Sequence, residues 1–313
     1  MRNYAYDHHI FNSKEYDLPI ICVGNLNVGG TGKTPMIEYL IRLLSNYQLA
    51  TLSRGYKRNT KGFQIADDTS NASSIGDEPF QFYSKFKEVI VAVDTNRQNG
   101  IAQLCKLEIT PDVILLDDAF QHRKVKAGYN ILLTAYDNLY VKDICLPTGN
   151  LREPISGAKR ANVIVVTKCP KEISENEKKQ IIKKLKPEAH QTVFFSSINY
   201  AKEAISLNRN IPLTELPNDV TLVTGIANPT QLVTYLNTQG IHFTHLNFRD
   251  HHNFSEEEIQ DLRRKKFILT TEKDYMRLKD HLEADSLYYL PIQIDIDKKE
   301  MFNGLIKNFV SSF

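Results

Sequence analysis

The segment PIICVGNLNVGGTGKTP, residues 19–35, combines three local signals in one order. The apolar run at residues 20–23 is typical of a buried strand, and the glycines that follow permit backbone conformations that other residues avoid. Pro35 is favoured in the first turn of a helix, and apolar side chains recur at helical spacing after it. The segment therefore predicts a strand, a glycine-rich turn and a helix, which is the arrangement of a phosphate-binding loop.

The same segment supplies the side chains that such a loop needs. Backbone amides turn toward phosphate oxygens, the Lys33 ammonium reaches the β- and γ-phosphates, and the Thr34 hydroxyl binds Mg²⁺. The predicted nucleotide-binding residues are Asn27, Val28, Gly29, Gly30, Thr31, Gly32, Lys33 and Thr34. Asn27 occupies a position, six residues before Lys33, where the general pattern has glycine. The segment predicts nucleoside triphosphate binding but does not identify an acceptor.

Apolar runs elsewhere in the chain predict the fold. Those at residues 89–93, 113–116, 131–133 and 163–166 are typical of strands covered on both faces, as in a parallel sheet. With the helix after the glycine-rich loop, they predict a P-loop NTPase-type α/β/α sandwich. A highly charged stretch ends at Pro187, and a new series of apolar runs begins at residue 193. We therefore expect a nucleotide-binding and catalytic domain at 1–185 and a smaller α/β domain at 186–313 that closes the cleft.

Composition excludes several broad classes of protein. Of the 313 residues, 42% are hydrophobic and 24% are charged, which gives no case for a disordered or fibrous chain. The net charge of +2 provides no strong field for binding nucleic acid. No apolar run reaches the ~18 residues of a membrane span, and the four cysteines form no C-x-x-C pair. We expect a cytoplasmic globular protein without a disulfide frame or a nucleic-acid partner.

Single positions disfavour two common P-loop classes. Partition-type regulatory ATPases usually carry lysine where this chain has Val28. Guanine-specific switches need an Asn/Thr-Lys-x-Asp segment after a late strand, whereas residues 167–170 are Thr-Lys-Cys-Pro. Because Pro170 replaces the required aspartate, ATP is the favoured nucleotide.

Acidic side chains follow the predicted strand at residues 113–116. Asp117 and Asp118 stand at its carboxyl end, where a Walker B carboxylate binds Mg²⁺ beside a phosphate loop. Neighbouring strand residues point to opposite faces, so the two carboxylates cannot share one orientation unless the strand has ended. We expect one to contact the metal directly and the other through water or a hydrogen bond. In the loop at residues 146–154, Arg152 and Glu153 suit phosphate and metal binding.

Two further clusters leave alternatives open. Asp77, ahead of a Phe- and Tyr-rich helix, fits a helix N-cap as well as a catalytic carboxylate. Asp250, His251 and His252 are consecutive, and either histidine suits pairing with a carboxylate of the first domain across a closing cleft. Ordinary surface or core histidines are the plainer interpretation, because no further metal ligand lies at helical spacing.

Eight segments together resemble the tetraacyldisaccharide 4′-kinase family, the lipid A kinases of Gram-negative bacteria. They are residues 23–35, Ser53-Arg54-Gly55-Tyr56, Gly76-Asp77-Glu78-Pro79, residues 117–122, Leu151-Arg152-Glu153-Pro154, residues 224–229, Asp250-His251-His252 and residues 269–274. They run in the family's order, and the family's own loop also lacks the glycine that Asn27 replaces. Two features depart from the family: Ala119 stands where glycine is common, and members usually have an apolar, membrane-contacting helix before a segment like residues 2–7.

The resemblance implies transfer of the ATP γ-phosphoryl group to the 4′-hydroxyl of a lipid A disaccharide 1-phosphate precursor in lipopolysaccharide biosynthesis. ATP and Mg²⁺ are the implied cofactors. The implied catalytic residues are Asp77, His251 and Lys33, the metal ligands Thr34, Asp117, Asp118 and Glu153, and the substrate contacts Arg54, Gln121, His122 and Arg152. The resemblance also implies peripheral association with the cytoplasmic face of the inner membrane, with the lipid as partner and no obligate protein partner.

The residues alone also fit a P-loop ATPase with a regulatory or assembly role and no lipid substrate. The two interpretations differ in one observable quantity, because only the kinase consumes ATP in proportion to added lipid disaccharide.

Overall fold

The computed structural model describes residues 2–250 and 252–313, and the chain divides into two compact units. The first comprises Met1–Ile198 and Ile294–Phe313, and the second Asn199–Gln293. Each unit is built on its own β-sheet.

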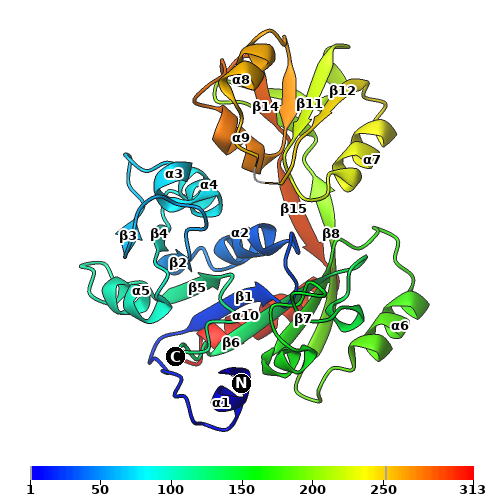
Figure 1. Cartoon of the computed structure of the whole chain (residues 1–313). Helices are drawn as coiled ribbons and strands as arrows, with labels where there is room; N and C mark the ends of the chain where they lie inside the picture. Colours follow the sequence, from blue (N-terminus) through cyan, green and yellow to red (C-terminus); the bar gives the residue numbers. More distant parts are fainter. Residues whose placement is uncertain (1, 251) are drawn as a thin grey trace. The chain divides into compact units, whose positions relative to one another are not determined.

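The first unit contains a nine-stranded sheet in the order β15-β8-β7-β6-β1-β5-β2-β4-β3 (Figure 1). Its strands are β1 (Ile20–Asn25), β2 (Leu49–Ser53), β3 (Gln64–Ile65), β4 (Ile90–Val93), β5 (Val113–Asp117), β6 (Tyr129–Ala135), β7 (Val163–Thr167), β8 (Thr192–Tyr200) and β15 (Ile292–Ile296). The pairs from β8 through to β4 are parallel, and every residue of β1, β2, β5 and β7 is buried. Continuous apolar runs form these strands because both faces of the sheet are covered.

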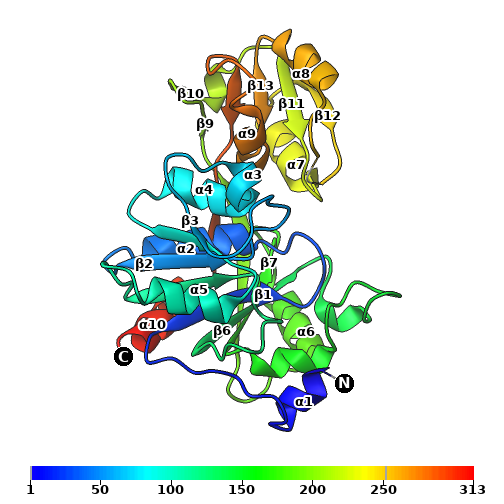
Figure 2. The same cartoon turned by 60° about the vertical axis from the view of Figure 1, so that its left-hand side comes forward.

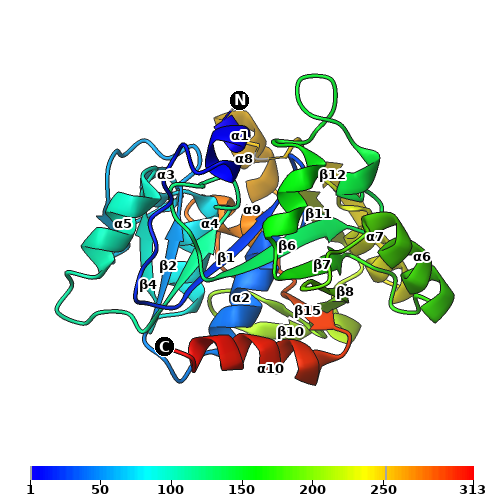
Figure 3. The same cartoon turned by 90° about the horizontal axis from the view of Figure 1, so that it is seen from below.

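Helices cover both faces of this sheet. Alternate residues of the strands pack against α2 (Lys33–Leu43), α4 (Asp77–Lys85) and α10 (Lys299–Val310) on one face, which Figure 3 shows from below. The other face packs against α5 (Arg97–Leu104), α6 (Glu175–Leu185) and the short 3₁₀ helices η1 (Tyr140–Lys142) and η2 (Ile155–Arg160). Two short helices, α1 (Arg2–Asp7) and α3 (Ala72–Ile75), complete the unit. The predicted P-loop NTPase-type α/β/α sandwich is confirmed.

The second unit is a smaller α/β layer structure (Figure 2). Its sheet has the order β10-β9-β14-β13-β11-β12, with strands β9 (Glu203–Ile205), β10 (Asn210–Pro212), β11 (Val220–Thr224), β12 (Phe243–Asn247), β13 (Ile268–Thr270) and β14 (Leu287–Tyr289). Helix α7 (Thr230–Thr238) packs on one face, and α8 (Glu256–Arg263) and α9 (Glu272–Leu278) pack on the other; η3 spans Leu213–Glu215. A second α/β domain was expected from its apolar runs.

The bounds of the compact units differ from the expected division at residues 185 and 186. Strand β8 extends the large sheet, and α10 buries Phe302, Ile306 and Val310 against that sheet, so both ends of the predicted second domain belong largely to the first unit. An apolar run shows that a strand is buried but does not show which sheet it joins, because strand neighbours are set by long-range pairing.

Two features concern the chain as a whole. Among the described helices, none is both long enough and apolar enough to span a lipid bilayer. The four cysteines are free thiols.

Candidate active site

The glycine-rich loop connects β1 to α2 at the carboxyl edge of the large sheet. Gly29 and Gly32 have φ angles of +114° and +85°, a region that disfavours side chains with a Cβ. Helix α2 begins at Lys33, two residues earlier than Pro35, so its free backbone N–H groups face the loop. Val28, Gly29 and Gly30 are exposed. The loop thus combines an accessible backbone with the positive end of a helix, as an anion site requires.

The structure explains why Asn27 replaces the expected glycine. Asn27 forms an antiparallel bridge with Leu151, and the backbone N–H of Val28 donates to the Asn150 carbonyl at 2.7 Å. The Asn27 side chain also donates to Asp143 at 3.2 Å. The first half of the loop is therefore held as extended backbone against another segment, where glycine has no advantage. Since the Val28 N–H is engaged, the amides that face a phosphate begin at Gly29.

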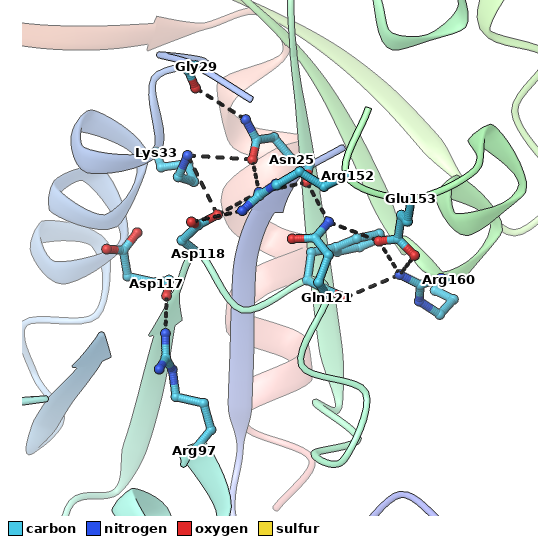
Figure 4. Close-up of polar contacts among 11 residues, drawn as sticks. Asn25, Gly29, Lys33, Arg97, Asp117, Asp118, Gln121, Arg152, Glu153 and Arg160 are labelled. Carbon is cyan, nitrogen blue, oxygen red and sulfur yellow. Dashed lines mark hydrogen bonds and ion pairs between the residues drawn. The ribbon is translucent and has the colours of Figure 1, made fainter. Parts of the chain in front are cut away.

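Asp117 and Asp118 lie beside the loop because β5 is the parallel neighbour of β1. Val23 is paired with Asp117 in the register of the two strands. Strand β5 ends at Asp117, and Asp118 has a φ of +49°, so the two carboxylates no longer follow strand alternation. Asp118 lies 3.6 Å from the Lys33 ammonium and accepts two hydrogen bonds from Arg152, at 3.0 and 2.7 Å (Figure 4). The parallel pairing of β1 with β5 thus produces a cation–carboxylate cluster at the sheet edge.

Lys33 and Arg152 share a further acceptor in this cluster. The Asn25 side-chain oxygen lies 3.5 Å from the Lys33 ammonium and also accepts a hydrogen bond from Arg152. Asn25 is fully buried at the end of β1. Its amide also donates to the Gly29 carbonyl at 3.4 Å, which links the strand end to the tip of the loop. Asn25 is not among the site residues predicted from the sequence, although its place between strand and loop is a usable signal.

The two neighbouring aspartates have opposite acidities. Burial and the adjacent Asp118 carboxylate raise the pKa of Asp117 to about 7. Burial acts in the same sense on Asp118, but Lys33 and Arg152 outweigh it and lower the pKa of that carboxyl to about 2. Asp118 is therefore ionised at neutral pH, whereas Asp117 is about half protonated there.

The oxygen atoms around Asp117 fit a hard divalent cation. Asp117 Oδ2 accepts a hydrogen bond from Ser53 at 3.3 Å, while its buried Oδ1 has no hydrogen-bond partner among the described residues. Thr34 lies in the first turn of α2, half-buried, where its hydroxyl suits the same kind of ion. The described residues contain no cluster of three or more His, Cys, Asp or Glu side chains suited to a metal. The Asp117 carboxylate and the Thr34 hydroxyl agree with Mg²⁺, because this ion is usually held by one or two carboxylates together with substrate phosphates.

Glu153 lies in a separate, buried network. Arg160 donates to both of its carboxylate oxygens at 2.8 Å, and Gln121 donates to one of them at 2.9 Å (Figure 4). Asn3, from helix α1, donates to the other at 3.0 Å. The Gln121 amide also donates to the Asn25 carbonyl at 2.9 Å. The carboxylate thus ties three segments to the end of β1, and a role for Glu153 as a metal ligand stays a prediction.

His122 borders a basic cavity of about 580 Å³ in the first unit. Burial lowers the pKa of its imidazole to about 4, with contributions from the Arg97 and Arg54 charges, so the ring is neutral at pH 7. The cavity is lined by Arg2, Tyr6, Ile10, Phe11, Asn12, Gln98, His122, Arg123 and Lys124. Its mixture of cations and apolar rings suits an amphipathic anion. Arg54 is exposed.

Asp77 is the first residue of α4, and the N-cap of that helix is Gly76. The N-cap interpretation of Asp77 is therefore wrong. Gly76 has a φ of +97°, and a Cβ there would lie 3.2 Å from the Gly55 Cα, so the two glycines allow α4 to approach the end of β2 closely. The neighbouring Glu78 contributes to the raised pKa of Asp117, which places the start of α4 near the carboxylate pair.

The histidine segment belongs to the second unit, and His251 lies outside the described residues. Asp250 lies 3.6 Å from the Lys273 ammonium. His252 Nε2 lies 2.9 Å from a carboxylate oxygen of Glu258, and its ring is stacked on Phe248 with 4.8 Å between ring centroids. His252 thus takes part in the packing of its own unit, and the pairing of either histidine with Asp77 stays a prediction.

Comparisons with known proteins agree on one family. Residues 1–310 match the family model described as tetraacyldisaccharide-1-P 4′-kinase. Relatives named tetraacyldisaccharide 4′-kinase include one from Flavobacterium johnsoniae, 54% identical over 99% of this chain and 92% of its own length. Another, from Phocaeicola vulgatus, is 42% identical over 99% and 91% of the two chains.

A solved structure shows the same fold. It is described as the "apo" form of LpxK from Aquifex aeolicus in complex with ATP, and it is 30% identical to this chain. The similarity has a TM-score of 0.77 and covers 99% of this chain and 94% of the other. The ordered motifs, the phosphate-loop architecture and these matches lead to one conclusion: the chain belongs to the tetraacyldisaccharide-1-P 4′-kinase family.

Proposed function

We propose that this chain transfers the γ-phosphoryl group of ATP to the 4′-hydroxyl of a tetraacyldisaccharide 1-phosphate. The main support from the structure is the cluster in which Lys33, Asp118 and Arg152 meet beside an accessible glycine-rich loop. Membership of the kinase family supports the acceptor, and the ATP complex of the Aquifex aeolicus relative supports the donor. Phosphoryl transfer requires positioning and charge neutralisation more than covalent chemistry, and this cluster supplies both.

The loop holds the triphosphate through its backbone and Lys33. The amides of Gly29, Gly30 and Gly32 and the start of α2 face the β- and γ-phosphates. The Thr31 N–H donates to the Gly29 carbonyl at 3.1 Å, so Thr31 contributes by shaping the loop. Lys33 exchanges its 3.6 Å contact with Asp118 for a phosphate oxygen, which leaves Asp118 to Arg152. Asn27 and Val28 contribute by fixing the entry of the loop rather than by a free amide.

Thr34 and Asp117 are the residues that would hold Mg²⁺, with Asp118 close enough to act through water. The bound ion supplies charge neutralisation of the β- and γ-phosphates. Asp117 must be deprotonated to bind a cation. Because its pKa is about 7, cation binding should weaken as the pH falls below that value. Ser53 then orients the carboxylate through its hydrogen bond to Oδ2.

Asp77 accepts the proton of the acceptor hydroxyl, with His251 as its partner. The positive end of α4 stabilises the Asp77 carboxylate, since acidic groups are favoured in the first turn of a helix. Arg54 and Arg152 stabilise the negative charge of the substrate, while Gln121 and His122 orient the sugar next to the cavity that His122 borders. Neutral His122 serves as a hydrogen-bonding group rather than as a cation.

The protein works at the cytoplasmic face of the inner membrane as a peripheral protein, with the lipid as its partner. Three exposed apolar side chains, Tyr4, Ile10 and Phe11, lie on and just after α1, and two of them adjoin the basic cavity. An apolar surface near cations suits an anionic lipid. The net charge of +2 supports neither nucleic-acid binding nor strong electrostatic adhesion to the membrane.

A transfer assay tests this function directly. Purified protein is incubated with γ-³²P-ATP, Mg²⁺ and tetraacyldisaccharide 1-phosphate, and labelled lipid is separated from ATP and free phosphate. Label in the lipid that depends on both protein and acceptor supports the kinase. ATP hydrolysis to free phosphate that is unchanged by the acceptor would instead support the ATPase without a lipid substrate.

A further inference from the structure

The carboxylate of Glu38 is buried between two helices of the first unit, α2 and α4. Its side chain is 2% exposed. Gln81 donates to Oε1 at 2.9 Å, and Lys85 and Arg42 donate to Oε2 at 2.7 and 2.9 Å. Gln81 and Lys85 belong to α4, whereas Arg42 belongs to α2 itself. A buried carboxylate therefore joins the helix that follows the glycine-rich loop to the helix that begins at Asp77.

The positions of these residues along the two helices relate the contact to the active site. Residues four apart in sequence lie on one side of a helix, one turn from each other. On α2, Glu38 is one turn after Thr34, and on α4, Gln81 is one turn after Asp77. The Glu38–Gln81 hydrogen bond therefore lies one turn from the proposed metal-binding hydroxyl on one helix and one turn from the proposed base on the other.

A second pair of contacts continues along the same sides of the helices. Lys85 is one turn after Gln81, and Arg42 is one turn after Glu38. The Arg42 guanidinium also lies over the ring of Phe86, the C-cap residue of α4, at 5.1 Å from the ring centroid. The two helices are thus joined over successive turns, which restricts sliding and rotation of one against the other.

Apolar packing places α2 more firmly than α4. Helix α2 contributes four apolar side chains to the core that covers this face of the sheet, namely Met36, Ile37, Leu40 and Ile41. From α4, Phe82 is the buried member of the same core. Apolar packing is non-directional, whereas hydrogen bonds to a carboxylate have preferred distances and angles. Loss of the Glu38 carboxylate should therefore displace α4 more than α2.

We propose that Glu38 is a positioning residue for phosphoryl transfer. By holding α4 against α2, it sets the place of Asp77 relative to Lys33 and Thr34. It acts through Asp77 and is not itself a catalytic residue. The proposal rests on the proposed function, because it takes Asp77 as the base and Thr34 as a metal ligand.

Four variants test this role in the lipid transfer assay. Glu38→Ala removes the carboxylate, Glu38→Gln keeps its length and an acceptor for Gln81, and Gln81→Leu removes the donor on α4. Tyr39→Phe is the matched control, since it removes a 2.7 Å hydrogen bond from α2 to Asn303 of α10 rather than to α4. Thermal melts and hydrogen–deuterium exchange of residues 77–85 are measured on the same preparations.

We expect Glu38→Ala to lower kcat about 10–100-fold with the KM for ATP within about twofold of wild type. A displacement of a reacting group by about 1 Å can cost about 10²-fold, and the loop itself is unchanged. Gln81→Leu should show a smaller loss of the same kind, and Glu38→Gln should retain more of kcat than Glu38→Ala. Exchange within residues 77–85 should become faster in Glu38→Ala. Tyr39→Phe should match wild type in kcat and in this exchange.

A combination with Asp77→Ala separates positioning from a general loss of stability. If Glu38 acts through Asp77, Glu38→Ala should lower kcat by less than about twofold further once Asp77 is alanine, because residues that act as a unit are non-additive. Long incubations with γ-³²P-ATP measure the low turnover of these variants. Multiplicative losses would overturn the proposal, as would a raised KM for ATP with unchanged kcat.

A lower melting temperature of Glu38→Ala with normal kcat would show a structural role and would also overturn the proposal. Lys85 and Arg42 are 22% and 38% exposed, so both cations can reach water when the carboxylate is removed. If Glu38→Ala nevertheless fails to fold, normal kcat in Gln81→Leu, or a loss that multiplies with that of Asp77→Ala, gives the same refutation. Wild-type protein that transfers nothing to lipid would refute the proposed function. Hydrogen exchange needs no turnover, so it would still decide whether Glu38 holds α4.

Discussion

At the edge of the large sheet, the Asp118 side chain is 37% exposed, whereas at the edge of the small sheet the Asp274 side chain is fully buried. Asp118 faces Lys33 and Arg152, two cations that are themselves partly exposed. Asp274 accepts hydrogen bonds from the Gly225 backbone at 2.9 Å and the Thr271 hydroxyl at 2.7 Å, and it pairs with Arg277 at 3.1 Å. Asp118 follows β5 directly, and Asp274 lies in the first turn of α9, the helix that follows β13, but only Asp118 is accessible to a ligand.

The acidities follow the same division. Lys33 and Arg152 overcome burial and keep the pKa of Asp118 at about 2, while burial raises the pKa of Asp274 despite its hydrogen bonds. A Cβ on Gly225 would lie 2.9 Å from Asp274 and 3.4 Å from the Arg249 carbonyl, so the loop after β11 is packed closely around this carboxylate. We infer that the edge of the large sheet keeps its charges for a ligand, whereas the edge of the small sheet uses them to hold its own loops.

The largest expected effect concerns Asp77. Asp77→Ala should lower kcat about 10²–10⁴-fold with little change in the KM for ATP, because it removes a positioned general base. Asp77→Asn, which keeps the shape of the side chain, should lose a similar factor. Steady-state kinetics of the transfer assay measure both. Normal kcat in either variant would show that Asp77 is not the general base. It would also weaken the inference that the edge of the large sheet keeps its charges for a ligand.

The His251 partnership has its own test. Since residues that act as a unit are non-additive, Asp77→Ala combined with His251→Ala should lose far less than the product of the two single losses. The double variant and both single variants are compared at saturating ATP and lipid. Multiplicative losses would show that the two residues act independently.

Lys33→Ala should reduce transfer by about 10²–10³-fold, the usual cost of removing a preorganised group that stabilises transition-state charge. The same variant should change thermal stability little, because the Lys33 side chain is 20% exposed and its partner Asp118 keeps Arg152. Kinetics and thermal melts are measured on one preparation. A large drop in melting temperature with normal turnover would make the large-sheet edge structural, like the small-sheet edge.

In contrast to Lys33→Ala, the substitution Asp274→Ala should lower stability more than it lowers activity. It leaves Arg277, whose side chain is 9% exposed, without its buried carboxylate, and such a loss costs about 3 kcal/mol of unfolding free energy. Urea unfolding measures the change, with Asp261→Ala as the control, because the Asp261–Arg264 pair is exposed and contributes little. The structural role would be contradicted if the fall in kcat of the folded protein, expressed as a free energy, exceeded the fall in the free energy of unfolding.

The smallest expected effect is a dependence of stability on pH. Asp117 has a folded pKa of about 7, above its unfolded value near ~3.9, so the folded state holds a proton that the unfolded chain releases between these values. Its contribution to stability is therefore lost as pH rises through about 7. Asp118 acts oppositely: its folded pKa of about 2 gives stability above pH ~4 that is lost in acid.

Urea unfolding of metal- and nucleotide-free protein at pH 5 and pH 8 separates the two groups. Asp117→Asn should reduce the loss of stability between the two values, since the amide does not titrate. Asp118→Asn should reduce that difference by less than Asp117→Asn does, because burial, the largest cause of the raised Asp117 pKa, remains after the Asp118 charge is removed. An identical pH dependence in wild type and Asp117→Asn would show that Asp117 is not protonated in the folded protein.

Much of the site could be predicted from short segments. The loop at residues 24–34 depends on a local backbone requirement, namely glycines with positive φ. The helix after it was predicted to begin at Pro35, two residues later than its start at Lys33. Asp117 and Asp118 were placed by their position after a buried strand. These features involve neighbours in sequence, so residue type and spacing are sufficient to predict them.

Other parts could not be predicted because they join distant segments. The Arg160–Glu153 pair lies within one loop region, but its links to Asn3 and Gln121 span 150 and 32 residues. The observed bounds of the two units differ from the predicted boundary at residues 185 and 186 for the same reason. Strand β15 and helix α10 return to the first sheet from the far end of the chain.

The sequence by itself determined that this chain has a phosphate-binding loop, an α/β/α sandwich and the motifs of a lipid A kinase, because each depends on residues close together in the chain. Only the tertiary structure decided that Asn27 is held by Leu151, that Arg152 pairs with Asp118 and that Thr167 is bonded to Thr31. Those contacts arise from the order β7-β6-β1-β5, which brings strand ends from distant parts of the chain to one edge. Strand order follows from how helices and strands bury their apolar faces together, and no local pattern encodes it.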